Sequence, residues 1–128
     1  MVFTSTALRQ HVPSDARRLW VALSGGLDSV VLLHALVQLR LPTPIAALHV
    51  NHQISPYASD WQQHCAALCA ALGVEYIAQS VVVEPSGRGL EDAARAARYA
   101  VFEAHVREGD CLLTAHHADD QAETMLLR

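Results

Sequence analysis

The sequence contains no lysine, and all nine of its basic residues are arginines. A phosphate-binding loop of the Walker A type needs a lysine directly after its glycines, so this class of nucleotide site is excluded. The formal net charge is −4 and the isoelectric point is about 6.0. The chain therefore offers no broad basic face to a polyanionic partner, and most contacts with such a partner must come from elsewhere.

Cysteines and long apolar runs are also scarce. Three cysteines, Cys65, Cys69 and Cys111, fit reduced thiols better than a disulfide framework. No apolar run approaches the roughly 18 residues that span a bilayer. Segment 1–18 has no apolar stretch of signal-peptide length. These absences predict a cytoplasmic protein without membrane contact.

Apolar residues make up 52% of the chain, which is enough for one core, so we expect a single domain over 1–128. Short apolar runs alternate with segments of helical periodicity. We expect strands at 19–23, 45–50, 76–83 and 111–115, and helices at 29–41, 60–72, 90–108 and from 119 onward. This alternation predicts an α/β fold: an open, Rossmann-like parallel sheet with helices on both faces. Ligands of such sheets bind beyond the carboxyl ends of the strands.

The connection after the first expected strand has the composition of a phosphate cradle. It reads Ser24-Gly25-Gly26-Leu27-Asp28-Ser29. Its glycines allow close backbone approach, and the helix that follows offers free N–H groups and a positive dipole end. The spacing matches neither the dinucleotide fingerprint nor the serine-hydrolase elbow. Asp28 would repel a phosphate unless a cation intervened, which indicates Mg²⁺; the alternative is an ordinary capped helix start.

Acidic and histidine side chains follow the fourth expected strand. His116, Asp120 and Glu123 are spaced i, i+4 and i+7, so they share one face if a helix extends back to His116. The alternative is that Asp120 and Glu123 form a capping box at the helix start. Either arrangement places carboxylates at the edge of the sheet that is expected to bind ligands.

Three further residues are candidates for nucleotide contacts. His49 lies near the end of the second strand and is either a core histidine or part of the site. Arg95 and Arg98 are three residues apart on the long helix. They belong either to a solvated helix face or to a clamp for a polyphosphate or pyrophosphate.

Four segments occur in order: SGGLDSVVLLHAL, LHVNH, GLEDAARAARYAVF and LLTAHHADDQAETMLLR. The first resembles the PP-loop signature of ATP-pyrophosphatases. Together, over about residues 17 to 128, they resemble the N-terminal PP-loop domain of the tRNA(Ile)-lysidine synthase family. That family fold is an adenine nucleotide alpha hydrolase fold, and this chain resembles a part of it that is truncated at the carboxyl end.

The resemblance implies a two-step ligation. ATP adenylates the C2 oxygen of the wobble cytidine in a CAU-anticodon tRNA(Ile), and free L-lysine then displaces AMP to form lysidine. It implies that loop 24–29, His49 and Arg95 bind ATP, with Asp28 on Mg²⁺. Arg98 is expected to contact the leaving pyrophosphate. The negative charge of Asp120 and Glu123 suits them to bind the amino groups of lysine. His116 is suited to act as a base or as a hydrogen-bond donor to phosphate.

The match also has departures. Gln53 stands where many relatives carry a basic residue, and relatives continue well beyond Arg128. We therefore expect tRNA contacts mainly from domains outside this chain, and no synthase activity from the chain alone. The last helix, ending at Arg128, leaves an uncovered sheet edge that is a candidate for homodimer formation.

Two other functions remain open. A tRNA 2-thiolation enzyme shares the PP-loop, but its iron–sulfur type needs C-x-x-C motifs, whereas Cys65 and Cys69 form C-x-x-x-C in an apolar helix and suit the core. A non-catalytic ATP-binding module of the universal-stress type shares the sheet. A module of that type would have no use for the acids Asp120 and Glu123 or for the arginines of the long helix.

Overall fold

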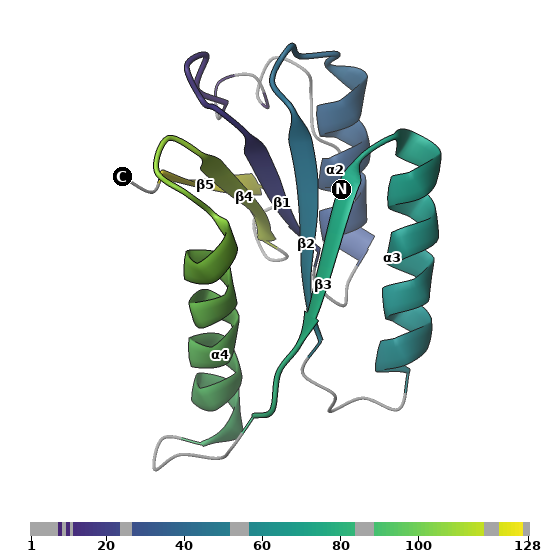
Figure 1. Cartoon of the computed structure of the whole chain (residues 1–128), viewed down its shortest axis with the longest axis vertical. Helices are drawn as coiled ribbons and strands as arrows, with labels where there is room; N and C mark the ends of the chain where they lie inside the picture. Colours follow the sequence, from purple (N-terminus) through teal and green to yellow (C-terminus); the bar gives the residue numbers. More distant parts are fainter. Residues whose placement is uncertain are drawn as a thin grey trace.

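The computed structural model describes residues 8, 10, 12–23, 27–51, 57–83, 89–116 and 121–126. Its elements are β1 (Leu19–Leu23), α2 (Leu27–Gln38), β2 (Ile45–Asn51), α3 (Ala58–Leu72), β3 (Glu75–Ser80), α4 (Leu90–His105), β4 (Cys111–His116) and β5 (Gln121–Leu126). They form one five-stranded sheet in the order β3-β2-β1-β4-β5 (Figure 1). The first four strands are parallel, and β5 pairs antiparallel with β4.

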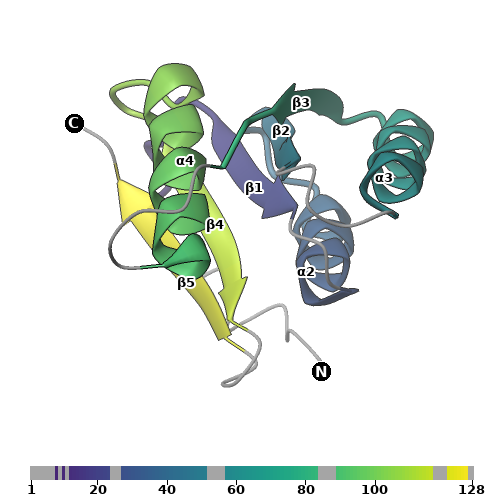
Figure 2. The ribbon, with the colours of Figure 1, turned by 90° about the horizontal axis from the view of Figure 1, so that it is seen from below.

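Helices cover both faces of the sheet, as predicted. Figure 2 shows α2 and α3 on one face and α4 on the other. The alternation of side chains along β1 explains the two layers. Leu19, Val21 and Leu23 pack with α2 and α3, whereas Trp20 packs with α4. Because both faces of the central strands are buried, β1, β2 and the start of β4 read as nearly continuous apolar runs.

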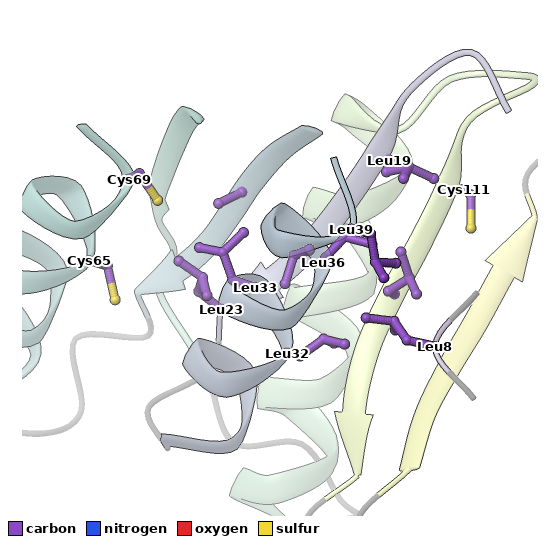
Figure 3. Packing of buried hydrophobic residues seen from close by; sticks show 13 residues of the cluster. Leu8, Leu19, Leu23, Leu32, Leu33, Leu36, Leu39, Cys65, Cys69 and Cys111 are labelled. Carbon is purple, nitrogen blue, oxygen red and sulfur yellow. The ribbon is translucent and has the colours of Figure 1, made fainter. Parts of the chain in front are cut away.

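The larger core lies between β1 and α2 (Figure 3). Leu32, Leu33 and Leu36 of α2 are fully buried, as are Cys65 and Cys69 of α3. Removing a leucine side chain from water contributes about 1.5–3 kcal/mol, so this cluster anchors α2 on the sheet. The prediction that the two cysteines of α3 are core residues is confirmed.

Backbone geometry at the helix ends explains most differences in length from the expected elements. α2 ends at Gln38 rather than at residue 41, because Arg40 adopts a positive φ of 51°. α3 ends as expected at Gly73, whose left-handed φ of 72° suits glycine. α4 ends at His105, three residues early, because Val106 is extended. Within the described ranges, no helix is both long and apolar enough to cross a membrane.

The expected helix from residue 119 onward is wrong. Residues Gln121–Leu126 form β5, with His116 paired to Gln121 and Cys111 to Leu126. Six residues are too few for a helix that is stable by itself, whereas pairing satisfies the backbone groups along the free edge of β4. The uncovered edge that we expected beside β4 is therefore occupied by β5, and the sheet is parallel except for this last strand.

Candidate functional site

The strand order has a topological switch point between β1 and β4. The chain moves from β1 to β2 and β3 on one side of the sheet, then crosses back through α4 to β4 on the other side (Figure 1). Open α/β sheets bind ligands at such a switch point, beyond the carboxyl ends of the strands. Register aligns Leu23 with His49 and Val21 with Leu113, so these parallel strands end at one edge. Below, this edge is called the carboxyl edge.

The first turn of α2 lies at the carboxyl edge. Leu27 is 69% exposed, Asp28 is partly buried and Ser29 is buried. Asp28 thus lies in the first turn of α2, at the positive end of the helix dipole, which favours an anion bound there. Its carboxylate is also the kind of hard oxygen ligand that Mg²⁺ prefers. Ser24, Gly25 and Gly26 lie outside the described residues, so the cradle itself stays a prediction.

His49 holds the end of β1. It is 4% exposed, and its Nδ1 lies 2.7 Å from the carbonyl oxygen of Leu23, the last residue of β1. A carbonyl only accepts, so Nδ1 carries the hydrogen, and Nε2 of the neutral ring is an acceptor. His49 can therefore be a core histidine and also lie at the site, because its ring is buried and bonds to the residue directly before segment 24–26. Its contact with a nucleotide stays a prediction.

A second polar group, which the sequence did not single out, fixes the end of β2. Asn51 is 6% exposed, and its Nδ2 donates to Oε1 of Gln62 in α3 at 2.9 Å. The Tyr76 hydroxyl of β3 donates to the Gln62 carbonyl at 3.1 Å. The only available signal was Asn51 at a strand end, because nothing in the local sequence pairs it with Gln62. These bonds hold α3 against the carboxyl edge.

Arg95 and Arg98 share one aromatic ring on α4. Their guanidinium carbons lie 5.8 Å and 6.0 Å from the centroid of Tyr99. Tyr99 packs edge-to-face on Phe102, with centroids 5.7 Å apart, which anchors the ring to the core. Among the residues that the structure describes, neither arginine forms an ion pair with a carboxylate. The two positive charges are therefore held close together near the middle of α4.

The residues expected on one face of a last helix are arranged differently. His116 ends β4 and Glu123 lies in β5, where it pairs with Thr114. The two positions are therefore neighbours in a hairpin rather than successive turns of a helix. The prediction that these residues share one helical face is wrong, because residues 121–126 pair with β4. Asp120 lies outside the described residues, so its role stays a prediction, as do those of His116 and Glu123.

The cysteines are placed for packing. Burial raises the pKa of Cys65 and of Cys111 to about 11, and it also raises the pKa of Cys69. A raised pKa keeps each sulfur as a thiol, which is a poor metal ligand. In the described part of the chain, no three histidines, cysteines or acids gather as a metal site.

Comparison with known proteins gives consistent results. A family model described as a PP-loop domain matches residues 2–128. The tRNA(Ile)-lysidine synthase of Alkalilimnicola ehrlichii is 53% identical over 110 residues, which cover 84% of this chain and 25% of that protein. That of Pseudomonas syringae is 50% identical over 113 residues, or 85% of this chain and 25% of that protein. The chain thus spans about a quarter of the relatives that it matches.

A solved structure is also similar. It is the U34-tRNA thiolase NcsA from Methanococcus maripaludis with its [4Fe-4S] cluster, at 25% identity and a TM-score of 0.51. The match covers 59% of this chain and 28% of that one. This likeness agrees with the α/β fold described above. The chain belongs to the PP-loop domain family.

Proposed function

We propose that this chain is the nucleotide-binding part of a tRNA(Ile)-lysidine synthase. The observation that carries the proposal is the 53% identity to a protein of that name over 84% of the chain. The convergence of Asp28, His49 and His116 at the carboxyl edge agrees with it. Because the chain spans a quarter of that relative, most contacts with tRNA come from domains outside it.

The first step is adenylation. The C2 oxygen of the wobble cytidine attacks the α-phosphorus of ATP, one O–P bond forms, and the bond to pyrophosphate breaks. Segment 24–26 and the N–H groups at the start of α2 hold phosphate oxygens. Arg95 and Arg98 place positive charge where the leaving pyrophosphate gains negative charge. The Asp28 carboxylate fits Mg²⁺, which, when bound, neutralises charge on the triphosphate.

The second step joins lysine to the base. The ε-amine of lysine attacks C2, the bond between C2 and the adenylated oxygen breaks, and AMP leaves. The amine must first lose a proton, for which His116 is a suitable base. Asp120 and Glu123 bind ammonium groups by charge. Asp120→Ala should therefore raise the KM for lysine more than the KM for ATP, and an equal effect on both would contradict that role.

The test is incorporation of labelled lysine into RNA. The complete gene product is mixed with Mg-ATP, labelled lysine and a CAU-anticodon tRNA(Ile) transcript. We expect label in the RNA, and its loss in Asp28→Asn. Asp15→Asn is the matched control, because this exposed residue precedes β1 at the opposite end of the sheet. ATP binding without incorporation would refute the lysidine reaction while leaving the PP-loop domain intact.

Thiolation is the second candidate, because a PP-loop thiolase has a similar structure. The cysteines of this chain give it little support: Cys65, Cys69 and Cys111 are fully buried, with raised pKa values. Transfer of sulfur to the same transcript, with a visible iron-dependent absorption band, would favour thiolation over ligation.

A further inference from the structure

A polar pocket lies at the end of the sheet opposite the carboxyl edge. Its volume is about 210 Å³, and it is lined by Arg17, Arg18, Trp20, Pro44, His105, Arg107 and Asp110. Most of the lining residues directly precede β1, β2 or β4 or directly follow α4, while Trp20 lies within β1 and His105 is the last residue of α4. The pocket therefore opens at the amino ends of the parallel strands, on the face that α4 covers. Below, it is called the arginine pocket.

The arginine pocket is built around a buried carboxylate. Asp110 is 6% exposed, and its Oδ2 accepts hydrogen bonds from Nε1 of Trp20 at 2.9 Å and from the backbone N–H of Arg107 at 3.0 Å. The backbone N–H of Asp110 donates to the Arg107 carbonyl at 3.0 Å. These bonds close a turn after α4 and fix Arg107 beside the start of β1.

The other two arginines are fixed by the same turn. The backbone N–H of Arg17 donates to the Gly109 carbonyl at 2.9 Å, and the carbonyl of Arg18 accepts from Cys111 at 2.9 Å. The aliphatic stem of Arg17 lies against Gly109, so close that an added Cβ would be 2.8 Å away. The backbone of the pocket is therefore tied together before any ligand arrives.

Charge in the arginine pocket is not balanced internally. Arg18 pairs with Glu75 at 3.4 Å and lies over the Trp20 ring at 5.5 Å. Within the described ranges, the guanidinium groups of Arg17 and Arg107 form no ion pair. Three arginines against Glu75 and Asp110 leave one net positive charge, in a chain whose net charge is −4. A group with a single negative charge, such as a phosphodiester, would balance it.

We infer that the arginine pocket binds one backbone phosphate of an RNA, an inference that rests on the proposed function for its choice of polyanion. Guanidinium forks match phosphate oxygens in geometry and charge. The seven residues of β2, at about 3.3 Å each, separate the arginine pocket from the carboxyl edge by roughly 20 Å. A nucleotide bound at the carboxyl edge is too short to reach that far, whereas a tRNA is long enough to span both ends of the domain. The contact is to the backbone, so it positions the RNA without reading its sequence.

The test measures the salt dependence of RNA binding by the complete gene product. Arg17→Gln and Arg107→Gln are compared with Arg40→Gln, a matched loss of one charge at an exposed residue outside the pocket. Fluorescence anisotropy is recorded with a CAU-anticodon tRNA(Ile) transcript and with a tRNA of unrelated anticodon. Each pocket variant should weaken both complexes about tenfold and reduce the slope of log K against log salt by about 1. Arg40→Gln should behave as wild type, and ATP binding should be unchanged in all three.

The outcomes separate the two proposals. Slopes equal to wild type in both pocket variants, with ATP binding intact, would overturn the RNA contact even if lysine incorporation is normal. The expected slope changes without lysine incorporation by the wild type would overturn only the proposed function. Unchanged RNA binding together with lost binding of inorganic phosphate or pyrophosphate would assign the pocket to a free anion and overturn the RNA contact. Failure of the wild type to bind either tRNA would also overturn it.

Discussion

Replacing Asp110 by alanine tests whether the buried carboxylate holds the amino ends of β1 and β4 together. The substitution leaves Nε1 of Trp20 without its acceptor in a residue that is 2% exposed. It also frees the backbone N–H of Arg107, which is only partly buried and can bind water instead. Leaving the buried Trp20 donor unsatisfied costs about 1–3 kcal/mol, and the more exposed N–H of Arg107 adds less. The free energy of unfolding should therefore fall by about 2–4 kcal/mol.

Three further variants make the Asp110 prediction specific. Asp110→Asn keeps an acceptor oxygen and loses only the charge, so it should cost about 1 kcal/mol. In a double-mutant cycle, Trp20→Phe with Asp110→Ala should cost at least about 1 kcal/mol less than the sum of the single changes, because the shared hydrogen bond is lost only once. Urea unfolding followed by far-ultraviolet circular dichroism gives the free energy of unfolding of the wild type and of each variant. An alanine variant within about 0.5 kcal/mol of wild type would refute the reasoning.

Other predictions follow from the same structure. Gly109→Ala should destabilise the chain by more than Gly73→Ala in thermal or urea unfolding: both glycines have positive φ, at about 1 kcal/mol of strain, but only at Gly109 does the new Cβ meet Arg17. Equal losses would show that the Arg17 stem moves freely. The free energy of unfolding should fall between pH 9 and pH 11, because the pKa of Cys65 rises from 9.0 to about 11 on folding, so the unfolded chain releases a thiol proton that the folded chain keeps. Cys65→Ala should fall less steeply over that range, and a slope equal to wild type would contradict the shift. Tyr99→Leu should raise the KM for ATP of the complete enzyme several-fold by releasing its two arginines, whereas Tyr99→Phe keeps the ring and should leave the KM unchanged.

The sequence predicted the central sheet well, because each buried strand is a short apolar run bounded by breakers. Leu19–Leu23 was predicted at both ends, and Gly73 was correctly placed as the end of α3. The wrong prediction for Gln121–Leu126 has a clear origin. The composition of this segment favours a helix, but the structure of so short a segment is decided by its pairing with β4, which the local sequence does not show. Helix ends were missed by up to three residues, because single backbone angles such as that of Arg40 decide them.

Prediction of the site was more uneven. The positions of Asp28 in the first turn of α2, His49 in β2 and His116 at the end of β4 could be assigned to one edge, because parallel strands bring their carboxyl ends together. The bond from Asn51 to Gln62 could not, since it joins two elements whose packing is set by the whole fold. The arginine pocket was also missed: Arg17, Arg18 and Arg107 are far apart in the chain, and only the pairing of β1 with β4 brings them together.

The crossover from β3 through α4 to β4 has a consequence for the order in which the domain assembles. Strands β1, β2 and β3, with α2 and α3, can pair from neighbouring pieces of chain as they leave the ribosome. β4 must pass over both β2 and β1 before it pairs, which requires closing a much longer loop. β1 stays an open edge until residues 111–116 arrive, and the switch point between β1 and β4, where we propose that the nucleotide binds, does not exist before then. ATP can therefore stabilise only the finished sheet, and it should slow the unfolding of the domain rather than speed its early folding.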